Sequence, residues 1–219
     1  ILSRGIASNP SESECYPAKR SHGHVTCLIK QGVPFIFYPA LFYERNETPD
    51  ANNHYNCPIV TSYAENIKNN VEEIGRGEVK FSNPFLAFSS LEVATEALIK
   101  EFSDIPAAEV TAAARAGWDE MTAARDDMRK KGEEVLAWME ANHKRGIVLA
   151  GRPYHVDPEI NHGIPELITS YGLAALPEDS VSHLRHPDRP PIVSEPRLYP
   201  PRLYPCAPHG SPRDGLELT

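Results

Sequence analysis

The sequence predicts an α/β protein with parallel sheets, in which a helical segment joins two α/β units. Short apolar runs at 33–38 and 58–63, bounded by Gly, Pro and Asn, alternate with helical patterns. A stretch rich in Ala, Glu, Lys and Arg follows at 107–144, and a strand–helix–strand pattern returns at 146–176. We therefore expect an α/β unit over 1–88, a helical segment over 89–145, the start of a second α/β unit over 146–184, and a Pro-rich tail over 185–219.

The first predicted helix begins close to a cysteine. Pro17 suits the first turn of a helix, where its missing N–H costs nothing, and this places Cys15 or Tyr16 near the cap. The helical pattern runs to about Gln31, and Gly32 is a typical stop. The sequence therefore predicts a helix that starts beside a thiol.

Two strands and a helix complete the first predicted unit. The run at 33–38 is almost entirely apolar and predicts a buried strand. A polar loop follows as far as Asn56, and the run at 58–63 predicts a second strand. Residues 64–74 favour a helix, which ends before the glycines at 75 and 77.

The middle of the chain is predicted to be helical. A first helix covers 91–102 and is opened by Ser89 or Ser90. A second covers 107–144, and Gly132 marks a place where it is expected to break. Apolar residues spaced by three and four form one stripe along it, which predicts a packing face: Ala114, Trp118, Met121, Met128, Val135 and Met139.

The second predicted unit begins with a strand at 146–150 and continues through a loop at 151–163. A helix over 164–171 ends before Gly172, and a strand over 173–176 completes a βαβ unit. The tail beyond is rich in Pro and contains an immediate repeat of the pentapeptide PRLYP. Such a composition predicts an extended segment on the surface.

Composition excludes several functional classes. Twenty-two basic and 30 acidic residues give a net charge of −8, which argues against nucleic-acid binding. No apolar run is long enough to cross a membrane, and no secretory signal pattern is present. The four cysteines form no C-x-x-C pair, and a chain of 219 residues does not need a disulfide framework. We therefore expect a cytoplasmic protein with reduced thiols.

Two cysteines are candidates for chemistry. Cys15 lies at a predicted helix N-terminus, where the positive end of the helix dipole favours the thiolate, which is the metal ligand and the nucleophile. Cys57 directly precedes the run at 58–63. Either residue also fits a structural interpretation, because cysteine is commonly a small buried hydrophobe. His22, His24 and Cys27 lack the paired short spacings that are typical of zinc sites.

The loop at 151–163 is the third candidate site. Loops at the carboxyl ends of parallel strands form the binding sites of α/β proteins. This loop contains Arg152, His155, Asp157 and His162, and its backbone N–H groups before the next helix would suit a phosphate or a carboxylate. The structural alternative is that Asp157 and His162 merely close the turn.

Several separated segments resemble the acyl-CoA dehydratase activase-related proteins of the 2-hydroxyglutaryl-CoA dehydratase and benzoyl-CoA reductase superfamily. The segments are SESECYPAKRSHGH, GVPFIFYP, NNHYNCPIVTSY and VLAGRPYHVDPEINHGIPEL, followed by EDSVSHL. They occur in the family's order and cover roughly residues 1–184. The resemblance implies Rossmann-like units with parallel sheets, and a fragment similar to the dehydratase component of a larger protein.

The resemblance also implies an oxygen-sensitive iron–sulfur cluster held by loop cysteines. An ATP-hydrolysing activator would supply the electron, and an acyl-CoA thioester would receive it. Cys15 and Cys57 match family cysteines, whereas Ala40 stands where the family tends to have a third. A cluster normally needs three or four thiolates, so Ala40 leaves open whether one binds.

Two functions therefore remain open at the level of sequence. The chain is either an iron–sulfur electron-transfer module of the 2-hydroxyacyl-CoA dehydratase (lyase) type, or a non-catalytic interaction domain that kept the fold and lost the cluster. The iron–sulfur function predicts that Cys15, Ala40 and Cys57 converge, because each lies at a strand end or a helix start of one α/β unit.

Overall fold

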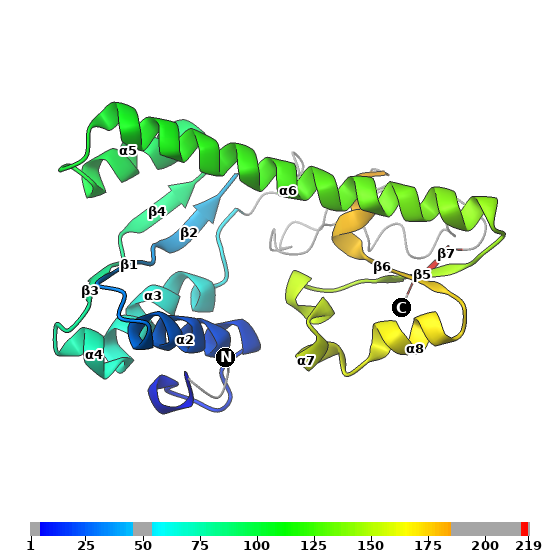
Figure 1. Ribbon diagram of the computed structural model, residues 1–219, viewed down its shortest axis with the longest axis horizontal. Helices are drawn as coiled ribbons and strands as arrows, with labels where there is room; N and C mark the ends of the chain where they lie inside the picture. Colours follow the sequence, from blue (N-terminus) through cyan, green and yellow to red (C-terminus); the bar gives the residue numbers. More distant parts are fainter. Residues whose placement is uncertain (1–4, 46–53, 185–215, 219) are drawn as a thin grey trace. The chain divides into compact units, whose positions relative to one another are not determined.

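The computed structural model describes residues 5–45, 54–184 and 216–218 (Figure 1). Contacts divide these residues into two compact units. The first lies within 5–45 and 54–114, and the second within 115–184 and 216–218. Apart from a short strand at 216–218, the predicted Pro-rich tail lies outside the described residues, as does Cys206.

The first unit opens with a 3-10 turn, η1 (Ile6–Ser8), and the predicted helix, α2 (Tyr16–Lys30). Cys15 is the N-cap residue of α2, and Gln31 is its C-cap. Gly32 follows with φ of +77°, a left-handed conformation that glycine adopts without strain. The prediction of this helix from its terminal residues is therefore confirmed.

Two short parallel sheets of two strands each lie in this unit. β1 (Phe35–Phe37) pairs with β3 (Lys80–Ser82), and β2 (Ala40–Glu44) pairs with β4 (Phe85–Phe88). Backbone bonds continue between the two pairs, from Tyr38 N to Ser82 O at 2.8 Å and from Ala40 N to Pro84 O at 2.9 Å. Only the first of these strands was expected. The polar loop predicted after residue 38 instead begins with β2.

The predicted strand at 58–63 is wrong, because these residues begin a helix. α3 (Pro58–Asn70) has Cys57 as its N-cap, and a short helix, α4 (Glu72–Gly75), follows. Pro58 occupies the first helical position, which proline tolerates well. The buried residues Ala64, Ile67 and Val71 recur at spacings of three and four, which is a helical period. The apolar run at 58–63 was too short to distinguish the two periods.

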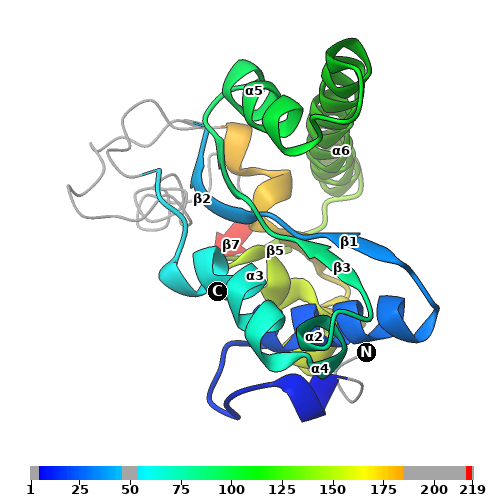
Figure 2. The same cartoon turned by 90° about the vertical axis from the view of Figure 1, so that its left-hand side faces the viewer.

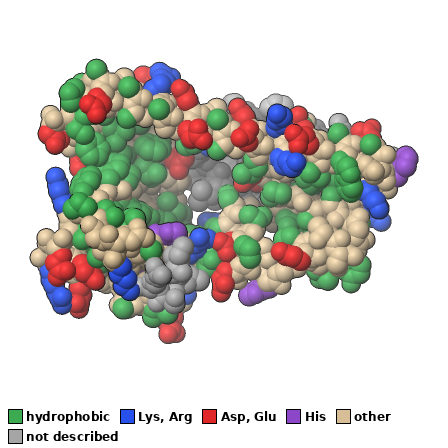
Figure 3. Space-filling model, viewed as in Figure 1, with side chains coloured by type: hydrophobic (Ala, Val, Ile, Leu, Met, Phe, Trp, Pro, Cys, Tyr) green, Lys and Arg blue, Asp and Glu red, His purple; other side chains and the backbone are tan. Residues whose placement is uncertain are grey.

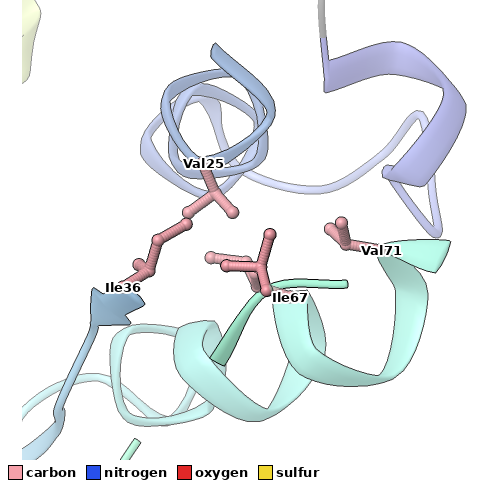
Figure 4. Packing of buried hydrophobic residues seen from close by; sticks show 5 residues of the cluster. Val25, Ile36, Ile67 and Val71 are labelled. Atoms are coloured by element: carbon pink, nitrogen blue, oxygen red, sulfur yellow. The ribbon is translucent and has the colours of Figure 1, made fainter. Parts of the chain in front are cut away.

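The core of the first unit lies between these helices and the sheet. Val25 of α2, Ile36 of β1 and Ile67 of α3 point toward one another, together with Val71 (Figure 4). Ile67 is 0% exposed and Val25 is 1% exposed. α2 and α3 lie on one side of the strands, and α5 (Leu91–Glu101) lies on the other (Figures 1 and 2). This packing fixes the helix starts that carry the two candidate cysteines.

The long predicted helix is present and is continuous through Gly132. α6 (Ala107–Ala141) starts within the first unit and continues in the second. Acidic and basic side chains are scattered along its visible face (Figure 3). Val135 and Met139 of the predicted stripe pack into the second core, whereas Met128 is 42% exposed. Gly132 does not break the helix, because α6 continues without interruption to Ala141.

The second unit contains a parallel sheet in the order β6-β5-β7. β5 (Gly146–Leu149) pairs with β6 (Ala174–Pro177) on one side and with β7 (Leu216–Leu218) on the other. Leu136 and Met139 of α6 pack with Leu176 of β6 to form its core. The elements after β5 are η2 (Pro153–Val156), α7 (Pro158–Asn161), α8 (Ile164–Ser170), η3 (Glu178–Ser180) and η4 (Ser182–Leu184).

These observations confirm the predicted fold class. Every pair of named strands is parallel, and helices connect them in an α/β arrangement that is consistent with Rossmann-like units. The βαβ unit predicted at 146–176 is present as β5, α8 and β6. Within the described ranges, no helix combines the length and the apolar character needed to span a bilayer.

Candidate functional site

Both candidate cysteines are N-cap residues of helices in the first unit. Cys15 precedes α2 and Cys57 precedes α3, and each helix has a proline in its first two positions. Neither cysteine side chain makes a capping hydrogen bond to its own helix. Cys15 is exposed and Cys57 is half-buried, and both are free thiols. Each thiol is therefore available for a role other than helix capping.

Hydrogen bonds fasten the loop before each cysteine. Asn66 Nδ2 of α3 donates to Glu14 Oε1 at 2.9 Å, which ties the start of α2 to α3. Asn56 is 8% exposed, and its Nδ2 donates to the Leu41 carbonyl at 3.1 Å. This bond ties the start of α3 to β2. The two helix starts are thus held by contacts that reach across the unit.

Tyr63 of α3 contacts the thiol of Cys15. Its Oη lies 3.8 Å from Cys15 Sγ, within reach of a sulfur hydrogen bond. Burial raises the pKa of the Tyr63 phenol well above its ordinary value, and the hydrogen bond and charge of Cys15 raise it further. Tyr38 and Cys57 also raise this pKa through their charges. Tyr63 therefore keeps its proton at neutral pH, and its hydroxyl lies within hydrogen-bond reach of the Cys15 thiol.

Ala40 lies at the start of β2, directly after Tyr38 and Pro39, and is 1% exposed. The charge of Tyr38, like the charges of the two cysteines, raises the pKa of Tyr63. Burial raises the pKa of Tyr38, and a hydrogen bond with Ser21 of α2 partly offsets that effect. Ala40 is therefore a packed alanine two residues after Tyr38.

His22 and Cys27, two further residues of α2, make contacts within the first unit. His22 is 1% exposed, and its Nδ1 lies 3.0 Å from Ser8 Oγ of η1. Burial lowers the pKa of His22, which favours the neutral imidazole. Cys27 Sγ accepts a hydrogen bond from Gln31 Nε2 at 3.5 Å. Across the part of the chain that the structure describes, no three His, Cys, Asp or Glu residues are grouped as a metal site would require.

A separate pocket of about 510 Å³ lies in the second unit, beside the carboxyl end of β5. Its wall is mostly aliphatic, and its polar lining residues are Arg152, His155 and Asn161. The other lining residues are Ile147, Leu149, Ala150, Gly151, Val156, Ile160, Ile164 and Ile168. This pocket contains two of the four residues that the sequence placed in a binding loop.

The ring of His155 is held at the pocket by its own loop. Its Nδ1 accepts a hydrogen bond from the backbone N–H of Arg152 at 3.2 Å. A Cβ atom at Gly151 would lie only 2.4 Å from that nitrogen, so glycine is needed for the close approach. Arg152 and His155 are therefore neighbours at one end of the pocket.

The other two predicted residues shape the loop and do not line the pocket. Asp157 Oδ1 accepts from the Glu159 N–H at 3.0 Å and caps α7. His162 follows α7 in the left-handed conformation, with φ of 51°. Asn161 is 7% exposed; it donates to the Val156 carbonyl at 3.0 Å and accepts from the Gly163 N–H at 2.9 Å. The positions of Asp157 and His162 agree with the structural alternative, in which these two residues close the turn.

Comparison with protein families accounts for the segments that resemble activase-related proteins. The family described as CoA enzyme activase uncharacterised domain matches residues 1–181. The chain belongs to this family. Comparison with curated proteins and with solved structures gave no match. The resemblance to activase-related proteins is therefore confirmed over both units.

Sequence reasoning missed two residues that organise this activase-related domain. Tyr63 falls in the predicted strand at 58–63, although it lies within α3 and its hydroxyl contacts Cys15. Asn161 was not singled out, although it fastens the loop after β5. The only sequence signal for Asn161 was its place before His162 and Gly163, because Asn commonly bonds to backbone groups two residues away.

Proposed function

We propose that this activase-related domain is part of an iron–sulfur electron-transfer system of the acyl-CoA dehydratase type, with Cys15 and Cys57 as thiolate ligands. The observation that carries the proposal is that both cysteines are uncapped N-cap residues of helices in the same unit, and that Cys15 Sγ lies 3.8 Å from Tyr63 Oη. The two thiols come from separate helices, 42 positions apart in sequence (57 − 15 = 42), and both raise the pKa of Tyr63. Partners would be an ATP-hydrolysing activator and an acyl-CoA thioester.

The two candidate cysteines supply about half of the thiolate ligands that an iron–sulfur cluster needs. Cysteine thiolate is the usual ligand of iron–sulfur clusters, which need three or four of them. The described residues offer two in this environment, so further ligands would have to come from outside that set. When bound, the cluster would supply one-electron transfer.

The chain's own residues would prepare the two thiolates. Tyr63 Oη lies 3.8 Å from Cys15 Sγ, and a hydroxyl at that distance can donate a hydrogen bond to a thiolate ligand. The first N–H groups of α2 and α3 receive no side-chain cap, and the partial positive charge of a helix N-terminus suits an anionic ligand. The bonds at Glu14 and Asn56 hold both helix starts in place.

Anaerobic reconstitution tests this proposal. We expect the purified chain to take up iron and sulfide, and we expect Cys15→Ser and Cys57→Ser each to reduce that uptake severalfold. Cys27→Ser is the matched control, because Cys27 lies in α2 and its thiol contacts Gln31. Uptake that is equal in all three variants would contradict the assignment of Cys15 and Cys57.

The buried Ala40 favours a second candidate, a non-catalytic interaction domain that has lost the cluster. Ala40→Cys distinguishes the two functions. If Cys15 and Cys57 belong to a depleted cluster site, this substitution raises iron and sulfide content, and adding Cys15→Ser abolishes the gain. One added sulfur in a packed position is expected to cost about 1–3 kcal/mol, so folding must be checked in parallel. A folded Ala40→Cys variant with no gain in iron supports the interaction domain.

A further inference from the structure

We propose that the pocket beside β5 binds an aliphatic carboxylate, with its hydrocarbon chain along the isoleucine wall and its carboxylate at Arg152 and His155. This site goes beyond the proposed iron–sulfur function and uses none of its residues. It lies entirely in the second unit, whereas the cysteines of the proposed function lie in the first.

The apolar wall is formed by β5 and the two helices that follow it. Ile147 and Leu149 are alternate residues of β5, so they point to the same face of the sheet. Ile164 and Ile168 are four residues apart in α8, so they lie on one face of that helix. Ile160 of α7 also lines the pocket. A volume of about 510 Å³ falls within the usual range for small-molecule pockets.

The polar end presents side-chain donors. Nδ1 of His155 accepts the Arg152 N–H, so in the neutral imidazole the proton is on Nε2, which becomes a donor. The Arg152 guanidinium is permanently charged and matches a carboxylate in geometry. Together these groups offer a positive charge and a neutral N–H at neighbouring positions of the pocket.

The backbone N–H groups of this loop offer fewer hydrogen-bond donors to an anion than the sequence predicted. Those of Arg152, Glu159 and Gly163 each donate to a side chain of the same loop, at 3.2, 3.0 and 2.9 Å. An anion here would therefore be recognised by side chains. Among the described residues that line the pocket, Arg152 is the only Lys or Arg, which suits one carboxylate better than a polyphosphate.

Calorimetric titration of the full chain with octanoate tests the charge recognition. We expect saturable binding of octanoate, and weaker binding of the uncharged octan-1-ol. Arg152→Gln should weaken octanoate about tenfold, the order expected for loss of one charge-assisted contact, and should leave octan-1-ol unchanged. Lys144→Gln is the matched control, because this exposed cation precedes the opposite end of β5 and is not among the lining residues.

A second pair of variants tests the apolar wall. Ile164 lines the pocket and is 50% exposed, whereas Leu167 of the same helix is 56% exposed and is not a lining residue. Ile164→Asn should weaken octanoate severalfold, and Leu167→Asn should not. Both positions are exposed enough for the variants to fold. Absence of saturable binding by the wild-type chain, or equal binding by these two variants, would overturn the proposal.

Octanoate binding that is insensitive to Arg152→Gln would equally overturn it. Cys15→Ser separates the two proposals, because Cys15 lies in the other unit. This variant should lose iron uptake and keep octanoate binding, so failure of one site leaves the other measurable.

Discussion

Replacement of Gly132 by alanine should destabilise the second unit, although alanine is the better helix former. Gly132 lies inside α6, where its Cα faces η3. A Cβ atom there would lie 2.1 Å from the Ser180 carbonyl oxygen and 2.8 Å from the Ser180 carbonyl carbon. Both atoms belong to the backbone, so the clash cannot be relieved by a side-chain rotation.

The magnitude follows from two opposing terms. Alanine in place of glycine in a helix interior stabilises by about 1 kcal/mol. Overpacking of a close contact costs about 1–3 kcal/mol, and a contact this short with backbone belongs at the upper end. We therefore expect Gly132→Ala to lower the free energy of unfolding by about 2 kcal/mol.

Gly117→Ala provides the matched control in the same helix. A Cβ atom at Gly117 would meet nothing within 4 Å, so only the propensity term applies. This variant should gain about 1 kcal/mol. Urea unfolding followed by the helical circular dichroism signal measures both variants against the wild type. A Gly132→Ala variant as stable as Gly117→Ala would refute the close approach of α6 to η3.

Three further predictions concern a cap, a buried histidine and a loop. Ser90→Ala should cost about 1 kcal/mol in urea unfolding, because Ser90 Oγ accepts the N–H of Val93, and Ser89→Ala should cost much less. Burial lowers the folded-state pKa of His22, so stability from this group is present above pH 6.5 and is lost as pH falls below it. The melting temperature should therefore drop less on acidification in His22→Gln than in the wild type. Asn161→Ala should lower stability by about 1–3 kcal/mol and weaken octanoate binding, since two backbone groups lose a partner; unchanged calorimetric affinity would contradict its positioning role.

Much of the candidate site was predictable as a set of residues, but its arrangement was not. Cys15 was chosen as a thiol at a predicted helix start, Cys57 as a thiol before a predicted strand, and Arg152 and His155 as residues of a loop after a strand. The sequence did not show that Tyr63 contacts Cys15, because that contact joins residues 48 positions apart. It also did not show which loop residues line a pocket and which close a turn.

The sequence by itself determined the features that depend on neighbours along the chain. Pro17 and Gly32 bound α2, and Ser90 opens α5, because caps and left-handed turns satisfy or release backbone groups within a few residues. The apolar run before Gly151 likewise identified β5, because that pattern also involves only adjacent residues. The α/β class followed from the order of these local elements.

Only the tertiary structure decided the rest. The residues from Pro58 form a helix because Ala64 and Ile67 become fully buried and Ile67 packs with Val25 of α2 and Ile36 of β1, a choice that the short apolar run left open. Gly132 is a point of close contact because η3, some 48 residues further along (180 − 132 = 48), packs against it. β7 joins β5 from the far end of the chain. Pairings and contacts between distant segments depend on the free energy of the whole packed unit, which no local pattern contains.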